Sequence, residues 1–198
     1  MIDERLKGQL AFLMEIDKMK TVLRRTLVAD GSKRENDAEH SWHLAMYSMV
    51  LYEYADNPEN IDLNRVIRMV LVHDLVEVYA GDTFCYDAKG NEDKEQRERE
   101  AADKLFALLP KEQGDEYRAL WEEFDRMDTP DSRFAASTDR LQPLLNNYVT
   151  QGHTWKLGDI SSKDVFKRME PIKTGAPELW KVVELIVEDS IKKGYLKK

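Results

Sequence analysis

Apolar residues recur at intervals of three and four along most of the chain, the spacing of one face of an α-helix. Near the amino terminus Leu6, Leu10 and Leu13 follow this spacing, and we expect a helix over residues 4–28. The pattern predicts further helices over residues 37–54, 64–79, 92–109, 112–127, 134–148, 161–169 and 177–193. It therefore predicts an all-α protein, a helical bundle.

Turn-forming residues separate the predicted helices. Residues 29–37 (ADGSKREND) form such a break, and residues 80–94 (AGDTFCYDAKGNEDK) are the longest stretch without a helical pattern. Long ordered loops inside compact domains are often functional. No repeat or shift in composition marks a second domain, so we expect a single domain over residues 1–198. Its core would cover about 20–150, with C-terminal helices at about 161–193 packed on it.

The charge balance narrows the possible partners. The net charge of −8 argues against a broad basic surface for nucleic acid. An anionic substrate would need local positive charge, from a metal ion or an arginine. The one cysteine, Cys85, allows no intrachain disulfide, and we read it as a small apolar side chain rather than a nucleophile. Without a signal peptide or a membrane-spanning apolar run, we expect a cytoplasmic protein with no membrane partner.

Four residues with metal-binding side chains lie in helical surroundings: His40 in AEHSW, His73 and Asp74 in VHDLVE, and Asp139 in STDRL. Imidazole and carboxylate groups suit a divalent transition metal, and such a metal can generate hydroxide at neutral pH. The His-Asp pair lies in an apolar run, where a charge is costly to bury unless it is paired or bound to metal. We therefore predict one metal site, in preference to capping or salt-bridged pairs.

Two further carboxylates are candidates for acid–base work. Glu77 lies four residues after His73 and three after Asp74, on the same face of a regular helix. Beside a metal it could take a proton from water or give one to a leaving group; otherwise it is an exposed helix carboxylate. Gly81 allows a sharp turn that would point Asp82 back into the cleft, although aspartate is also common in turns.

The other polar residues near these motifs have simpler interpretations. His43 shares a helix face with His40, and a role at a second metal is conceivable, but we interpret His43 and His153 as structural. Arg140 follows Asp139, and we expect it to point away toward solvent or another carboxylate.

Taken together, four segments resemble the HD-domain phosphohydrolases, and within them the YfbR-like 5′-deoxynucleotidase group. They are RENDAEHSWHLAMYSMVL (34–51), VLVHDLVEVYAGD (70–82), KEQREREAADKLFALLP (94–110) and STDRLQPLLNNY (137–148). The family shares an H…HD…D metal motif, and the Glu and Gly-Asp that follow HD make the match more discriminating. The resemblance covers roughly residues 20–150 and leaves the last 40 or so unmatched.

The resemblance implies an HD-type helical fold and one divalent transition metal ion, such as cobalt, manganese, iron, nickel or zinc. Its ligands would be His40, His73, Asp74 and Asp139. The resemblance also implies a homodimer and a small-molecule nucleotide substrate.

The resemblance further implies that Glu77 helps to activate the attacking water, and that Asp82 contacts the sugar 3′-hydroxyl or assists the leaving group. The family holds the phosphate with an arginine from the first helix. Arg25 is the better match by spacing, although a length change in the following loop could substitute Arg24. The aromatic residue expected after this arginine is replaced by Thr26, which affects contacts to the base.

The expected reaction is attack of water on the phosphate of a deoxyribonucleoside 5′-monophosphate, releasing a deoxynucleoside and phosphate. Other proteins of this family cleave nucleoside triphosphates, guanosine tetraphosphate or cyclic dinucleotides, and these are alternative substrates. A metal- or nucleotide-binding regulator without turnover is another possibility. The last alternative is a structural helical scaffold in which these polar residues only form ion pairs or hydrogen bonds with one another.

Overall fold

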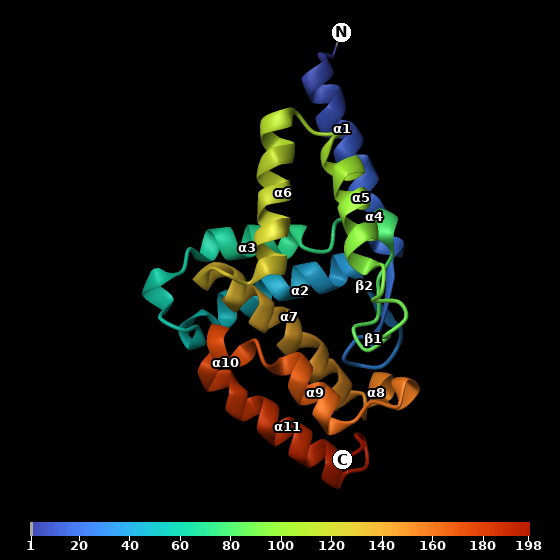
Figure 1. The fold of residues 1–198 in the computed structure, drawn as a ribbon, viewed down its shortest axis with the longest axis vertical. Coiled ribbons are helices and arrows are strands. Elements are labelled where there is room, and N and C mark those ends of the chain that lie inside the picture. The colour runs from blue at the N-terminus through green and yellow to red at the C-terminus, as the bar shows by residue number, and fades with distance from the viewer. Residues whose placement is uncertain (1) are drawn as a thin grey trace.

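The computed structural model describes residues 2–198, and helices form most of it (Figure 1). The prediction of an all-α protein is confirmed. The described residues also form one small two-stranded hairpin, which the sequence did not predict. In chain order the elements are α1 (Glu4–Ile16), the 3-10 helix η1 (Asp17–Thr21), β1 (Leu23–Leu27), β2 (Arg34–Asn36), α2 (Asp37–Val50), η2 (Tyr52–Tyr54), η3 (Pro58–Asn60), α3 (Leu63–Val72), α4 (Glu77–Ala80), α5 (Lys94–Phe106), α6 (Lys111–Arg126), α7 (Pro130–Val149), α8 (His153–Gly158), α9 (Ser162–Met169), α10 (Ile172–Gly175), η4 (Pro177–Leu179) and α11 (Trp180–Lys192).

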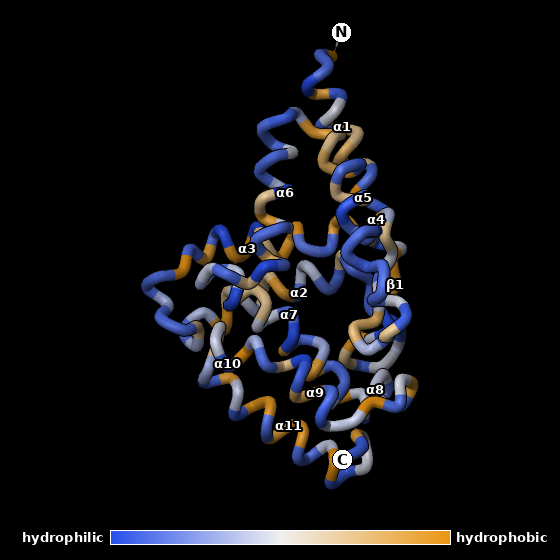
Figure 2. The backbone as a smooth tube through the Cα atoms, viewed as in Figure 1, coloured by the Kyte–Doolittle hydropathy of each residue, from blue (hydrophilic) through white to orange (hydrophobic). Residues whose placement is uncertain are grey.

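Helix α7 is the central element of the bundle. It packs against α2, α3, α6, α9, α10 and α11, and α1, α5 and α6 run together as an arm above this body (Figure 1). A capping box of Thr129 and Ser132, with Pro130 in the first turn, starts α7 where the sequence places a break. Small residues such as Ala135 and Ala136 are fully buried and let neighbouring helices approach closely. Apolar and polar residues alternate along the outer helices, as in α11 (Figure 2).

The prediction of one helix over residues 4–28 is wrong beyond Ile16. The chain tightens into η1 and then forms strand β1, which pairs antiparallel with β2, with Leu23 opposite Asn36 and Leu27 opposite Arg34. The β-branched side chains near β1 suit a strand, and pairing with β2 outweighs the local helical pattern. Arg24 and Arg25 therefore lie on a strand and not on the first helix.

The expected helix over residues 64–79 is interrupted at the His-Asp pair. Helix α3 ends at Val72, residues 73–76 form turns, and α4 begins at Glu77. Backbone bonds of the i+3 type, such as Glu77 N to Asp74 O at 2.9 Å, tighten the chain here. The side chains of His73 and Asp74 therefore do not follow the 100° step of a regular helix.

The C-terminal segment is more broken than the sequence predicts. Helix α8 was not expected, and the predicted last helix begins only at Trp180, after α10 and η4. Helix α11 packs on α7 and α9, and Ser161 forms a bridge with Lys197. Among residues 2–198, no helix combines the length and the apolar character needed to cross a membrane.

Candidate metal centre

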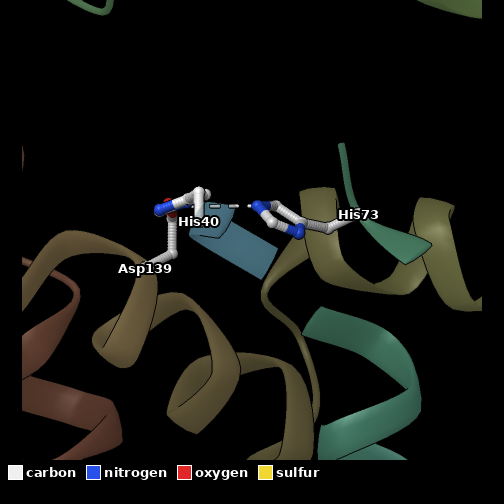
Figure 3. Close-up of side chains that lie close together, drawn as sticks. All are labelled: His40, His73 and Asp139. Atoms are coloured by element: carbon white, nitrogen blue, oxygen red, sulfur yellow. Dashed lines mark hydrogen bonds and ion pairs between the residues drawn. The ribbon is translucent and has the colours of Figure 1, made fainter. Parts of the chain in front are cut away.

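The four residues chosen from the sequence, the His–Asp set, converge on one point. His40 comes from α2, His73 from the turn after α3, and Asp139 from the middle of α7 (Figure 3). Asp74 follows His73 in the same turn. His40 Nε2 lies 3.0 Å from Asp139 Oδ1 and 3.9 Å from Asp74 Oδ2. His73 Nε2 lies 3.0 Å from Asp74 Oδ1 and 3.8 Å from Asp139 Oδ1. Ligand atoms of His40, His73 and Asp139 thus all lie within 4.8 Å of one another, and Asp74 contacts both histidines.

The tautomer of His40 is fixed by a buried relay. Its Nδ1 donates to Gln142 Oε1 at 3.0 Å, and the amide Nε2 of Gln142 donates to Glu35 Oε1 at 2.6 Å. Because the amide nitrogen is committed to Glu35, the amide oxygen must face His40. The Nε2 lone pair of His40 is therefore directed toward the His–Asp set.

His73 is oriented in the same sense by the backbone. Its Nδ1 donates to the carbonyl of Val70 at 2.8 Å, one turn earlier in the chain. The Nε2 lone pair is left facing Asp74 and Asp139. A hydrogen bond from one ring nitrogen that aims the other at a common centre is typical of metal-binding histidines.

The two imidazoles differ in their electrostatic surroundings. Burial and the Arg24 charge lower the pKa of His40 to about 4. Burial also opposes charge on His73, but attraction to Asp74 and a hydrogen bond with Asp139 raise its pKa to about 10. A bound cation would replace the proton that the carboxylates attract to this centre.

A second group of carboxylates, the acidic cluster, adjoins the His–Asp set. It consists of Asp37, Glu77 and Asp82, whose nearest carboxylate oxygens lie within 4.8 Å of one another. Both side-chain oxygens of Asp37 and Oε2 of Glu77 are buried, and no group in residues 2–198 donates a hydrogen bond to them. Such oxygens are costly to bury without a cation or a proton.

The pKa values of the acidic cluster follow from this crowding. Burial and then the Asp74 charge raise the pKa of Asp37 to about 7. Burial, with the charges of Asp74 and Asp37, raises the pKa of Glu77 well above its usual value. Burial also raises the pKa of Asp82. The structure thus brings Glu77 and Asp82 to the site, where their charged forms need positive charge nearby.

Arg24 supplies positive charge between the two groups. Its Nη1 lies 3.0 Å from Asp74 Oδ2 and 3.6 Å from Asp37 Oδ1, and its Nε lies 3.7 Å from Glu35 Oε2. The Arg24 side chain is only 14% exposed. Arg24, which the sequence analysis left open as the alternative to Arg25 for holding the phosphate, therefore lies beside the His–Asp set.

Arg25 lies in another part of the same pocket. Its guanidinium stacks over the ring of Phe84 at 4.7 Å, and its Nη2 lies 4.0 Å from Asp87. Thr26, next along the strand, is buried. The structure thus does not place Arg25 against the His–Asp set.

Two arginines hold the far oxygen of Asp139. Arg140 Nη1 lies 3.0 Å from Asp139 Oδ2, and Arg168 Nη2 from α9 lies 3.4 Å from the same oxygen. The expectation that Arg140 points away is wrong: it is buried, and also donates to the carbonyl of Ala136. With Oδ2 held by cations, Oδ1 remains directed at the two histidines.

The loop that carries Asp82 is tied down by one arginine of α5. Gly81 has a φ of 76°, a backbone angle that favours glycine and turns the chain back toward the site. Arg97 donates to the carbonyls of Ala80 and Gly90 at 2.7 and 2.9 Å, and to Thr83 Oγ1 at 3.1 Å. This long loop is therefore ordered across the pocket.

One pocket adjoins the His–Asp set and also contains Glu77 and Asp82. Its charged and aromatic lining residues are Arg24, Arg25, His73, Asp74, Glu77, Asp82, Phe84, Tyr86, Lys94, Phe124, Asp125, Asp139, Arg140, Trp155 and Arg168.

Sequence reasoning missed Asp37, Glu35, Gln142 and Arg168. Asp37 and Glu35 precede His40 in the run REND, which the sequence presents as an ordinary loop and helix start. The structure buries both, at 0% and 2% exposure. His43 lies outside the two carboxylate groups, with its Nδ1 3.4 Å from Gln142 Nε2 and its ring against Tyr47.

The residues fit a divalent transition metal ion. Two histidine Nε2 atoms and the carboxylates of Asp74 and Asp139 face one another, and the neighbouring acidic oxygens lack hydrogen-bond donors among the described residues. The His–Asp set could hold the ion, with Gln142 and the Val70 carbonyl orienting its ligands.

The chain is similar in sequence and in structure to known proteins. A family model described as HD domain matches residues 16–180. A crystal structure of a predicted metal-dependent phosphohydrolase from Magnetospirillum magnetotacticum MS-1 is 48% identical, with a TM-score of 0.93, covering 98% of this chain and 97% of that one. The 5'-deoxynucleotidase HDDC2 of Mus musculus is 30% identical over 70% of this chain and 67% of its own length. That of Homo sapiens is 29% identical, over 70% and 66%. The chain thus matches about two thirds of these curated relatives.

Proposed function

The chain belongs to the HD domain family, and on this premise we propose that it is a metal-dependent phosphohydrolase. Its substrates would be deoxyribonucleoside 5′-monophosphates, which it converts to deoxynucleosides and phosphate. The observation that carries the proposal is the convergence of His40, His73, Asp74 and Asp139 beside a pocket with an acidic cluster and arginines. The names of the relatives support the substrate class.

In this proposal the His–Asp set holds one divalent ion. When bound, such an ion lowers the pKa of a coordinated water toward 7 and offsets negative charge on the phosphate. Gln142 and the Val70 carbonyl keep the two histidine lone pairs directed at it, while Arg140 and Arg168 hold the far side of Asp139.

The acidic cluster carries the proton transfers. Glu77 accepts the proton of the attacking water as the water oxygen bonds to phosphorus and the bond from phosphorus to the 5′-oxygen breaks. Asp82, on the loop tied down by Arg97, contacts the sugar 3′-hydroxyl or delivers a proton to the departing 5′-oxygen. Glu77 and Asp82 line one pocket, and their nearest carboxylate oxygens lie within 4.8 Å of each other, which supports their action on the same bound ester.

Arg24 is our choice for the arginine beside the phosphate, in place of Arg25. It lies 3.0 Å from Asp74, a member of the His–Asp set, whereas Arg25 stacks on Phe84. Arg25 then lines the part of the pocket that receives the nucleoside.

The decisive experiment is phosphate release from a panel of nucleotides by metal-stripped protein and by protein reloaded with cobalt, manganese, iron, nickel or zinc. We expect release from deoxyribonucleoside 5′-monophosphates only after reloading. The panel includes triphosphates, guanosine tetraphosphate and a cyclic dinucleotide, and preference for one of these would replace the substrate assignment. If every reloaded form of the protein binds nucleotides but releases no phosphate, the proposal of an enzyme is refuted and a nucleotide-binding regulator is favoured.

We also propose a homodimer and a single domain over residues 1–198. Exposed apolar side chains on α1 support association: Leu13 is 57% exposed and Met14 is 72% exposed. Light scattering of the wild type and of Leu13→Glu would test it. The packing of α11 on α7 and α9 supports one domain. The single cysteine supports a cytoplasmic location.

A further inference from the structure

Arg168 reaches the site from α9, in the part of the chain that shows no motif. The helix is held in place by a capping box of Ser161 and Asp164 at its start and by the buried side chains of Val165 and Met169. It packs against α7, which carries Asp139. The backbone that presents Arg168 is therefore fixed relative to the His–Asp set.

The guanidinium of Arg168 is poorly used by the protein itself. Within residues 2–198 its one hydrogen bond joins Nη2 to Asp139 Oδ2, at 3.4 Å. That oxygen already has a closer partner, since Arg140 Nη1 lies 3.0 Å away. Arg140 has two further acceptors, the Ala136 carbonyl and the sulfur of Met127. Arg140 would therefore still hold this oxygen of Asp139 if Arg168 turned to another anion.

Exposure separates Arg168 from the other two arginines that contact the His–Asp set. Its side chain is 36% exposed, compared with 14% for Arg24 and 9% for Arg140. Arg24 is surrounded by Asp74, Asp37 and Glu35, so three carboxylates share its positive charge. Arg168 lines the pocket and faces one carboxylate.

The charge of the pocket makes a free guanidinium important. A phosphate monoester must approach a wall that holds Asp74, Asp139, Glu77 and Asp82, and like charges repel it. A planar guanidinium can take two phosphate oxygens at once. Arg24 and Arg168 each contact one acid of the His–Asp set, Asp74 and Asp139 respectively, so both lie beside the same centre.

We propose that Arg168 is a phosphate-binding residue of this pocket, and that it takes phosphate oxygens of the substrate together with Arg24. The inference rests on the proposed function and adds a residue from α9 to it. It assigns a role to the C-terminal segment, which would supply a second guanidinium beside the His–Asp set.

The test compares Arg168→Ala and Arg168→Lys with the wild type, using Arg68→Ala as the matched control. Arg68 is an exposed arginine paired with one carboxylate, Glu116, away from the pocket. Binding of inorganic phosphate to metal-loaded protein is measured by calorimetry, alongside metal content, KM and kcat for a deoxyribonucleoside 5′-monophosphate. We expect Arg168→Ala to weaken phosphate binding and raise KM by roughly 10- to 100-fold, the loss of hydrogen bonds to a charged group. Metal content stays unchanged, the lysine variant recovers part of the affinity, and Arg68→Ala behaves as the wild type.

Two results would overturn the inference. One is unchanged phosphate affinity in Arg168→Ala with lower metal content and lower kcat, which would make Arg168 a positioning residue for Asp139. The other is wild-type behaviour of Arg168→Ala in all four measurements. The wild-type protein could instead bind phosphate in a way that depends on Arg168 and yet hydrolyse no monophosphate. That result would support the inference and refute the proposed function. The two failures are therefore distinguishable.

Discussion

Gln142 Oε1 lies 3.0 Å from Nδ1 of His40, and the amide nitrogen of the same Gln142 side chain is bound to Glu35. This relay aims the other nitrogen of His40 at the proposed ion. We expect Gln142→Leu to lower metal affinity by about 10- to 100-fold, the usual effect of losing a partner that orients a ligand. Competition with a chelator of known affinity measures the change. Gln113→Leu, on α6, is the control, and equal affinity of Gln142→Leu and the wild type would contradict the relay.

Asp74 contributes to the His–Asp set and also pairs with Arg24. We expect Asp74→Ala to lose both the metal ion and phosphatase activity, because the remaining groups no longer enclose a cation. Metal analysis after desalting and phosphate release measure the two losses. Asp128→Asn, at an exposed position, should retain both. An Asp74→Ala protein that keeps stoichiometric metal would remove this residue from the ligand set.

Glu77 is buried beside the His–Asp set, with Oε2 lacking a hydrogen-bond donor among residues 2–198. We expect Glu77→Ala to retain the ion but to lower kcat by roughly 10²- to 10⁴-fold, the range typical of a lost general base. Steady-state kinetics on metal-loaded protein, with metal content determined in parallel, separate the two effects. Full turnover by this variant would show that its assigned role is wrong.

Arg97 ties together the loop that carries Asp82, through Ala80, Thr83 and Gly90. We expect Arg97→Ala to speed amide hydrogen exchange over residues 81–93. Because Asp82 is then held less firmly, kcat/KM should fall by roughly 10- to 100-fold, as small misplacements of reacting groups do. Arg99→Ala, two residues along the same helix and paired with Glu95, is the control. Unchanged exchange in Arg97→Ala would contradict the structural role.

Glu123 joins α6 to α3 through Arg65 and to the start of α7 through Thr129 Oγ1, at 2.6 Å. Burial opposes its charge, but hydrogen bonds from Arg65 and Thr129 leave the pKa of Glu123 below its usual value. A lowered pKa in the folded state gives stability that is present above the unfolded pKa, about 4.3, and is lost as pH falls through the folded pKa.

At pH 7 we therefore expect Glu123→Gln to lower the free energy of unfolding by about 1–3 kcal/mol. Urea unfolding from pH 7 to pH 3.5 should show the difference from the wild type shrinking below pH 4. Glu188→Gln, at an exposed position, provides the baseline. A difference that stays constant across this range would contradict the linkage to Glu123 ionisation.

The helical class and the convergence of His40, His73, Asp74 and Asp139 could be predicted from the sequence, because helical periodicity and metal-binding side chains are both local signals. The end of the first helix could not. Leu6 to Leu13 continue a helical pattern toward Leu27, and only pairing with residues 34–36, a long-range contact, turns that segment into a strand.

The parts of the site that were missed have no local signal either. Asp37 occupies the first turn of a helix, where aspartate is common at exposed positions, yet here it is fully buried. Arg168 is one basic residue among several in the sequence SKDVFKRM, and its neighbour Asp139 lies 29 residues earlier. In the buried relay, His40 and Gln142 are 102 residues apart in the sequence, so only the tertiary packing of α2 against α7 brings them together.

Arg24 and Arg25 are successive residues of strand β1, and their side chains point to different parts of one pocket. One arginine therefore meets the carboxylates while the other meets the ring of Phe84. Gain or loss of a single residue in this hairpin would exchange the two guanidiniums. Substrate choice can thus diverge between descendants of this protein through hairpin length alone, with every cation ligand kept in place.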